Sequence, residues 1–159
     1  TAVTPDLPDR GVHPELRQID RWLNRDVTSL EELRGQVVAV QFWTFAGRNC
    51  KATLPHMQDL YAAYHDQGFE IVGIHAPEFS YEAEVDNIVE AAAELGVTWP
   101  IALDTRKHTF HDWQEGPRGY WPRLYLLDRE GNIRYDHRGE GRYSQTEAAI
   151  QALLAEPAT

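Results

Sequence analysis

The stretch FWTFAGRNCKATLPHM (residues 42–57) contains Cys50, the only cysteine of the 159-residue chain. It continues VVAVQ (37–41), so that residues 37–43 form an almost unbroken run of β-branched and aromatic side chains. Such a run predicts a central strand that is covered on both faces. After a loop at 46–49, apolar side chains recur at helical spacing up to about residue 65, at Leu54, Met57, Tyr61 and Tyr64. We therefore expect a buried strand, a short loop and a helix that begins near Cys50.

The rest of the chain alternates strand and helix patterns. FEIVGI (69–74) and WPIALD (99–104) predict two further strands. Between them an amphipathic helix that ends near residue 96 is marked by Val85, Ile88, Val89 and Ala92. PRLYLLD and IRYDHRG, on either side of a turn at 130–132, predict an antiparallel hairpin.

Two candidate capping boxes mark helix starts, one at Ser29 with Glu32 and one at Ser144 with Glu147. The proline-rich residues 1–19 predict an irregular N-terminal arm. The order of the elements predicts one α/β domain over residues 20–159, with a mixed central sheet flanked by helices.

Composition excludes several classes of function. The chain has 15 Lys and Arg against 25 Asp and Glu, a formal net charge of −10 that opposes nucleic-acid phosphates and anionic lipid surfaces. It has no apolar run of membrane-spanning length, so we expect no direct membrane insertion. One cysteine cannot form an internal disulfide bond.

The motifs now point to a family. Trp43, a turn, Cys50 at a helix start, Pro55 and a later Trp121–Pro122 together resemble the thioredoxin fold, with Pro122 in the place of its cis-proline. Longer segments resemble the TlpA/DipZ-like redoxin domains of thiol–disulfide oxidoreductases, among them SLEELRGQVVAVQFWT, GFEIVGIHAPEF and YWPRLYLLDREGNIRY. The resemblance implies a thioredoxin fold in which residues 76–104 form a strand–helix insertion. It implies no cofactor and favours an extracytoplasmic location, although a cytoplasmic one is also compatible with the sequence.

Two departures from the family bear on activity. The family carries Cys-x-x-Cys after the tryptophan, and Gly47 stands where the first, attacking cysteine would be. Disulfide exchange needs a thiolate nucleophile and a second thiol. Thioredoxins also carry a buried carboxylate two residues before the tryptophan, where this chain has Gln41. The incomplete site leaves open whether the domain is an enzyme.

Cys50, which matches the resolving cysteine, has two interpretations. It is either a buried and inert core residue, or a reactive single thiol that forms mixed disulfides or reduces peroxide as in peroxiredoxins. Peroxiredoxins place a threonine three residues before their reactive cysteine, where this chain has Gly47. Glu78 matches a carboxylate near the thiols of TlpA-like reductases and could tune Cys50, or it is a solvated loop residue.

The remaining candidates concern binding. His108 and His111 have a spacing seen in metal sites, but without a third ligand in register they predict surface residues and no metal site. A groove beside Pro122 is expected to bind an extended peptide or protein segment through main-chain hydrogen bonds, with residues Trp43, Arg48, Asn49, Trp121 and Pro122. The sequence thus predicts a redoxin-like binding domain without the dithiol cycle, with a one-thiol redox enzyme that uses Cys50 as the alternative.

Overall fold

The sheet is built around β2 (Val37–Trp43), whose seven residues are all buried. The computed structural model of the chain describes residues 7–115 and 119–156. β2 pairs in parallel with β3 (Phe69–His75) and antiparallel with β5 (Arg123–Leu127). Because side chains of a strand alternate between the two faces of its sheet, a strand without polar alternation needs packing on both faces. The central position expected for residues 37–43 is confirmed.

The described strands form one mixed sheet of six, in the order β1-β4-β3-β2-β5-β6. β4 (Ile101–Leu103) is parallel to β3, and β6 (Ile133–Arg138) is antiparallel to β5. At the far edge, β1 (Trp22–Leu23) adds only two residue pairs to β4. The predicted α/β class and mixed sheet are therefore confirmed, whereas β1 was not expected from the sequence.

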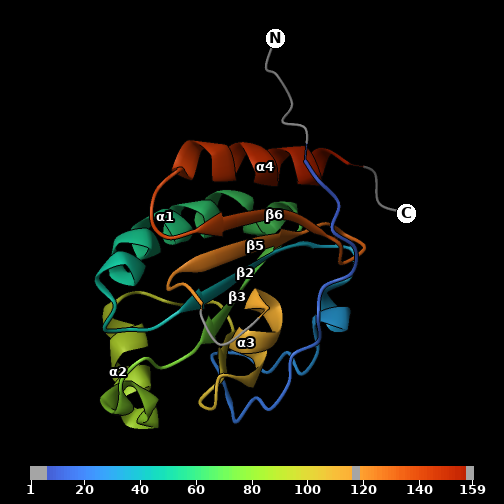
Figure 1. Cartoon of the computed structure of the whole chain (residues 1–159). Coiled ribbons are helices and arrows are strands. Elements are labelled where there is room, and N and C mark those ends of the chain that lie inside the picture. The colour runs from blue at the N-terminus through green and yellow to red at the C-terminus, as the bar shows by residue number, and fades with distance from the viewer. Residues whose placement is uncertain (1–6, 116–118, 157–159) are drawn as a thin grey trace.

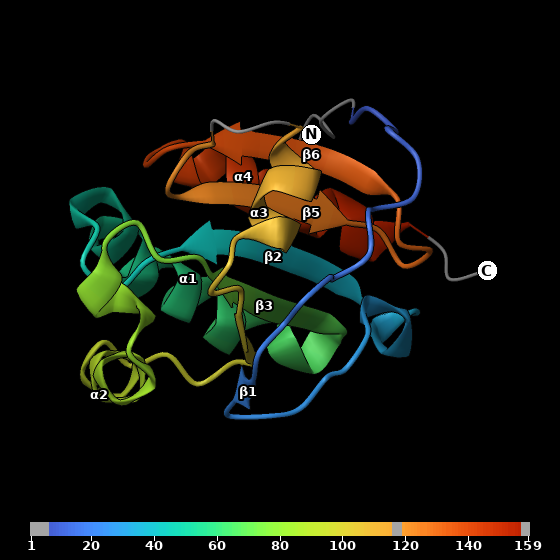
Figure 2. The same ribbon diagram turned by 60° about the horizontal axis from the view of Figure 1, so that its bottom comes forward.

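Helices cover both faces of the sheet (Figure 1). α1 (Arg48–Tyr64) and α4 (Tyr143–Ala155) lie on one face, and α3 (His108–Gln114) lies with the N-terminal segment on the other (Figure 2). α2 (Val85–Glu94) packs on the core beneath α1. No helix within the described ranges is long and apolar enough to cross a membrane.

The alternation of β2 creates two separate cores. Val37, Ala39 and Trp43 point into the core shared with α1, α2 and α4. Val38, Val40 and Phe42 point into the core beneath α3, where Phe42 meets the rings of Phe110, Trp113 and Tyr125. The loop that leaves β2 at Trp43 therefore emerges between two packed layers.

Both predicted capping boxes are wrong in detail. Ser29 does cap a helix start, but its hydroxyl accepts from the N–H of Glu31, and the element is a short 3-10 turn (Leu30–Leu33). Ser144 lies inside α4, where the N-cap is Arg142 in a left-handed conformation. Glu147 instead accepts a hydrogen bond of 2.6 Å from the hydroxyl of Tyr64, which is distant in sequence.

Two further features of the helices differ from expectation. The helical spacing predicts that Val89 is buried, but its side chain is 46% exposed. The helix α3 was not predicted, although its start is held by the carboxylate of Asp104, which accepts from the N–H groups of Thr109 and Phe110 at 3.3 and 2.7 Å. A seven-residue helix is too short to show a periodic pattern.

The N-terminal arm is irregular over residues 7–19, apart from one bridge between Val12 and Asn132. It runs along the β5–β6 hairpin, where Arg10 joins Arg123 in binding the carboxylate of Asp136. Residues 1–6 of the predicted arm lie outside the described residues, and the boundary between residues 19 and 20 stays a prediction.

Candidate functional site

The loop between β2 and α1 holds the position of the missing cysteine. Gly47 is the N-cap of α1, with φ −70° and ψ 127°, and no side chain caps this helix start. These angles are open to any residue, so the backbone does not require glycine here. A Cβ atom built on Gly47 would lie 3.1 Å from the sulfur of Cys50 and 3.4 Å from its Cβ. The loop therefore holds position 47 as close to Cys50 as in a Cys-x-x-Cys pair, although the sulfur at position 47 is missing.

Cys50 lies in the first turn of α1 and is 1% exposed. Burial raises the pKa of its thiol to about 12, against the effect of a hydrogen bond from the main chain of Thr44. The negative charges of Glu82 and Glu78 raise this pKa further. Cys50 is thus a protonated thiol at neutral pH, which is neither accessible nor nucleophilic.

Gln41 occupies the position of the thioredoxin carboxylate, next to α1. Its side-chain N–H donates to the Thr53 hydroxyl at 3.0 Å, and this hydroxyl donates to the carbonyl of Cys50 at 2.7 Å. The amide oxygen of Gln41 has no hydrogen-bond partner among the described residues. Gln41 lines a cavity of about 20 Å³ together with Thr53 and Pro122, a volume large enough for one water molecule. No ionisable acceptor stands behind Cys50 at this position.

The Trp121–Pro122 peptide bond is cis, and Pro122 lies beside α1 across that small cavity. The segment before it is held by the buried amide of Gln114, which accepts from the N–H of Tyr120 at 2.8 Å and donates to its carbonyl at 3.3 Å. The indole N–H of Trp121 donates to the carbonyl of Ala76 at 2.7 Å. Sequence reasoning missed Gln114 because it belongs to the unpredicted helix α3.

A buried carboxylate that the sequence analysis did not single out organises this region. Glu82 is 0% exposed and accepts hydrogen bonds from the Thr44 hydroxyl, from the N–H of Ala46 at 3.2 Å, and from the N–H groups of Glu78 and Phe79 at 3.2 and 2.9 Å. It joins the loop before α1 to the segment after β3. Glu78, which was proposed to tune Cys50, is itself exposed. Glu82 sits among other acidic residues in the sequence, so no local pattern distinguishes it from a solvated side chain.

His75, at the end of β3, is a second residue that sequence reasoning missed. Its ring is 1% exposed, packs edge-on against Trp43 and stacks on Phe45, and its Nε2 accepts from the N–H of Phe45 at 3.2 Å. Burial lowers the pKa of His75 to about 4, although the charge of Glu82 acts to raise it. His75 is therefore a neutral core residue at pH 7.

Of the predicted groove residues, Arg48 and Asn49 are exposed and Trp121 is partly exposed. Trp43 is 1% exposed, so it supports the site from within the core rather than lining a surface groove. His108 and His111 lie on α3, on the opposite side of the sheet from α1. The described residues contain no cluster of three side chains suited to hold a metal ion.

Known proteins match this chain over most of its length. Residues 18–136 match the model of the AhpC/TSA family. The chain belongs to this family. The AhpC/TSA-family domain is 39% identical over 151 residues to the protein DipZ of Mycobacterium tuberculosis, covering 93% of this chain and 21% of DipZ. It thus spans about a fifth of the length of the DipZ proteins it matches.

Two other comparisons cover nearly the whole length of both proteins. The thiol-disulfide oxidoreductase YkuV of Bacillus subtilis is 29% identical over 143 residues, which are 90% of this chain and 94% of YkuV. The crystal structure of a thioredoxin-like superfamily protein superposes with a TM-score of 0.82 at 27% identity, covering 93% of this chain and 99% of the other. The suspected thioredoxin-like, DipZ-related redoxin domain is therefore confirmed.

The burial of Cys50 predicts slow modification in the folded domain. A charged thiol reagent at pH 7.5 is expected to label native Cys50 roughly a hundredfold more slowly than the unfolded chain. A matched control carries Cys50→Ala with Ala52→Cys, which moves the thiol to an exposed position of the same helix. Fast labelling of native Cys50, at the rate of this control, would contradict the assignment.

The buried neutral state of His75 predicts a loss of stability in mild acid. Its pKa of about 4 in the folded domain lies below the ordinary value of 6.5, so the unfolded chain binds a proton first. The contribution of neutral His75 to the free energy of unfolding is fully present above pH 6.5. It falls by up to about 3 kcal/mol as the pH drops towards 4. His75→Gln, which keeps an acceptor for Phe45, is expected to flatten this dependence in urea unfolding between pH 7.5 and 4. The control His56→Gln, at an exposed position, should leave the pH dependence of unfolding unchanged. An unchanged pH dependence in H75Q would refute the assignment of His75 as a buried neutral residue.

Proposed function

We propose that this thioredoxin-family domain binds an extended segment of a partner protein along the edge formed by Trp121, Pro122 and the start of α1, and does not run the dithiol cycle. The family assignment supplies the redoxin scaffold. YkuV is named a thiol-disulfide oxidoreductase, and whether that activity extends to this chain depends on the chain's own residues.

The observation that carries the proposal is that the main-chain N–H and C=O groups of Trp121 are unpaired among the described residues. Within the described ranges, its N–H and C=O have no hydrogen-bond partner, whereas the carbonyl of Pro122 is taken by the N–H of Gly139 at 2.8 Å. Unpaired main-chain groups on a rigid edge are what an added strand uses for pairing. Gln114 and Ala76 hold this edge in place, so its geometry does not depend on a bound partner.

The start of α1 provides the side of the proposed binding site that lies opposite Trp121. Arg48 and Asn49 are exposed there, and no side chain caps the first N–H groups of the helix. These donors carry partial positive charge and favour a carbonyl oxygen of an incoming segment. The absence of sulfur at Gly47 leaves room for the segment but no atom that could attack it.

The one-thiol alternative is less well supported. A mixed disulfide or a sulfenic acid at Cys50 requires a thiolate that solvent or substrate can reach. The pKa of this thiol is raised to about 12, and its side chain is 1% exposed. A binding function needs neither property.

Restoring the missing sulfur should restore exchange chemistry. Across a disulfide, a Cβ lies about 3.0 Å from the opposite sulfur and about 3.5–4.5 Å from the opposite Cβ. The 3.1 and 3.4 Å separations at Gly47 are close to these values. We expect no catalysis of insulin reduction by dithiothreitol in the unmodified chain, and turnover in Gly47→Cys that increases further with Gln41→Asp, which returns a proton acceptor.

Cys50→Ser is the control for this experiment. It should abolish the activity of the Gly47→Cys chain and have no effect on the unmodified one. Turnover by the unmodified chain that is lost in C50S would show that Cys50 acts alone, in favour of the one-thiol enzyme.

Binding is tested with a library of acetylated ten-residue peptides and isotope-labelled domain. The best peptide is expected to shift the amide resonances of Trp121, Arg48 and Asn49. Asn49→Trp, on the exposed rim, should weaken binding roughly tenfold, while Gln67→Trp beyond the other end of α1 should leave it unchanged. Shifts confined to another surface, or equal losses in both variants, would refute the proposed edge.

A further inference from the structure

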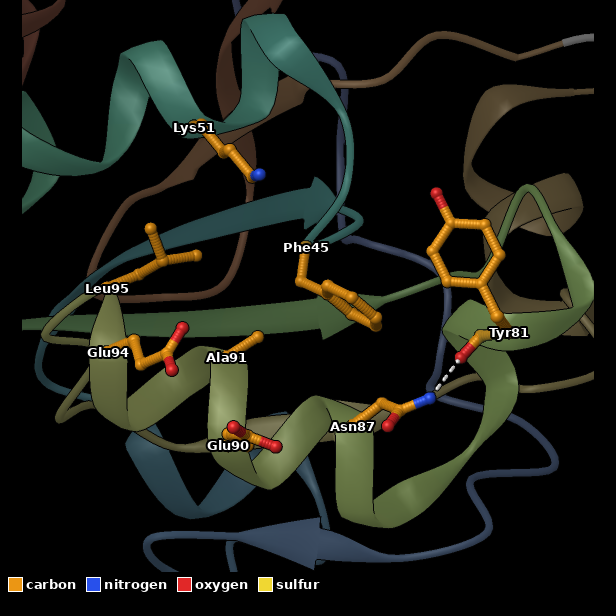
Figure 3. A pocket seen from close by; sticks show the side chains of 8 residues that line it. All are labelled: Phe45, Lys51, Tyr81, Asn87, Glu90, Ala91, Glu94 and Leu95. Atoms are coloured by element: carbon orange, nitrogen blue, oxygen red, sulfur yellow. Dashed lines mark hydrogen bonds between the residues drawn. The ribbon is translucent and has the colours of Figure 1, made fainter.

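A pocket of about 380 Å³ lies next to the proposed binding edge, between the start of α1 and the length of α2 (Figure 3). It begins at the same loop, because Phe45 lies two residues before Gly47 and Lys51 directly follows Cys50. Its remaining lining comes from Tyr81, Asn87 and one face of α2. The pocket is therefore within reach of a segment bound at the start of α1.

One wall of the pocket is aromatic. The rings of Phe45 and Tyr81 meet at 78° with centroids 6.0 Å apart, and Phe79 lies parallel to Tyr81 at 6.1 Å. Phe79 and Tyr81 are 55% and 52% exposed, so both rings are accessible to a ligand. Exposed rings at the mouth of a pocket favour a ligand that can stack on them.

The facing wall is acidic. Glu90 and Glu94 are one helical turn apart on α2 and both line the pocket. Neither forms a salt bridge within residues 7–115 and 119–156. Lys51 approaches from α1 on the opposite side (Figure 3). Its ammonium group can donate to a carbonyl oxygen of a bound main chain, while the two carboxylates are left for a cation.

The walls are held in place before any ligand arrives. The Glu82 carboxylate binds the loop that carries Phe45 and the segment that carries Phe79. Asn87 of α2 donates to the carbonyl of Tyr81 at 3.0 Å and so ties the aromatic wall to the acidic helix. A preformed pocket reduces the entropic cost of binding.

We propose that this pocket binds an arginine side chain of the partner segment, an inference that rests on the proposed function and specifies its partner. A guanidinium is planar and can stack on one of the two rings of Phe45 and Tyr81, which meet at 78°, while it donates to Glu90 and Glu94. The lysine ammonium lacks both the plane and the fork of donors. The chain's net charge of −10 also favours a basic partner.

The probe for this proposal is N-acetyl-arginine methylamide, compared with the citrulline and lysine analogues. Citrulline keeps the shape of the arginine side chain but is neutral. In amide-resonance titrations the arginine probe should shift Tyr81, Glu90 and Glu94, and the citrulline probe should bind roughly tenfold more weakly, with lysine between them. Equal affinity of arginine and citrulline probes, or no arginine-dependent shift at these residues, would overturn the proposal.

Two pairs of charge-neutralising variants test whether the affinity for the arginine probe comes from the pocket. Glu90→Gln with Glu94→Gln should weaken the arginine probe roughly tenfold, whereas Glu31→Gln with Glu32→Gln, the same change of charge at another exposed site, should not. An equal loss in both pairs would assign the affinity to net charge and refute the pocket.

The peptide library separates the two proposals. Peptides that bind at Trp121 with no preference for arginine would refute the pocket and leave the binding edge intact. An arginine probe that binds at α2, together with peptides that never contact Trp121, would refute the edge and leave a separate cation pocket.

Discussion

The fully buried carboxylate of Glu82 is the constraint on which the site depends. A charge removed from water is tolerated only when hydrogen bonds replace its hydration. Glu82 obtains these from Thr44 and Ala46 before α1 and from Glu78 and Phe79 after β3. The two segments must therefore converge on one point, which positions the start of α1 without help from a disulfide bond.

This arrangement keeps the loop geometry of a Cys-x-x-Cys site although only one cysteine is present. The backbone at Gly47 is extended and would accept a cysteine, whose Cβ would lie 3.1 Å from the sulfur of Cys50 and 3.3 Å from the Cγ2 of Thr44, so these neighbours would shift slightly. Cys50 itself is buried under that loop, which raises its pKa to about 12. Behind it, the amide of Gln41 bonds to Thr53 and cannot take up a proton as a carboxylate does.

The proposed binding function uses the surface around Gly47 and the start of α1. Its polar groups near the centre are main-chain donors and acceptors at Trp121 and at the start of α1. Its charged and aromatic groups lie to one side, where α2 faces Phe45 and Tyr81. Rigid main-chain edges give affinity for an extended segment, and neighbouring pockets give selectivity among side chains. Neither would require a thiolate.

The sequence by itself determined the central strand at 37–43, the helix that begins near Cys50, the hairpin and the family. It also identified the absence of sulfur at Gly47 and of a carboxylate at Gln41, since the residue at each position of the family motif is read directly from the sequence. These features rest on local periodicity or on residue identity. They require no knowledge of which distant residues meet.

Only the tertiary structure decided which polar residues are buried. Glu82 and His75 resemble solvated residues in the sequence, yet both are shielded because partners from the loop before α1 cover them. The strand β1 and helix α3 are too short for a periodic signal and are held by contacts across the chain. Periodicity records which face of an element is apolar, whereas the environment of a buried polar group depends on segments that are remote in sequence.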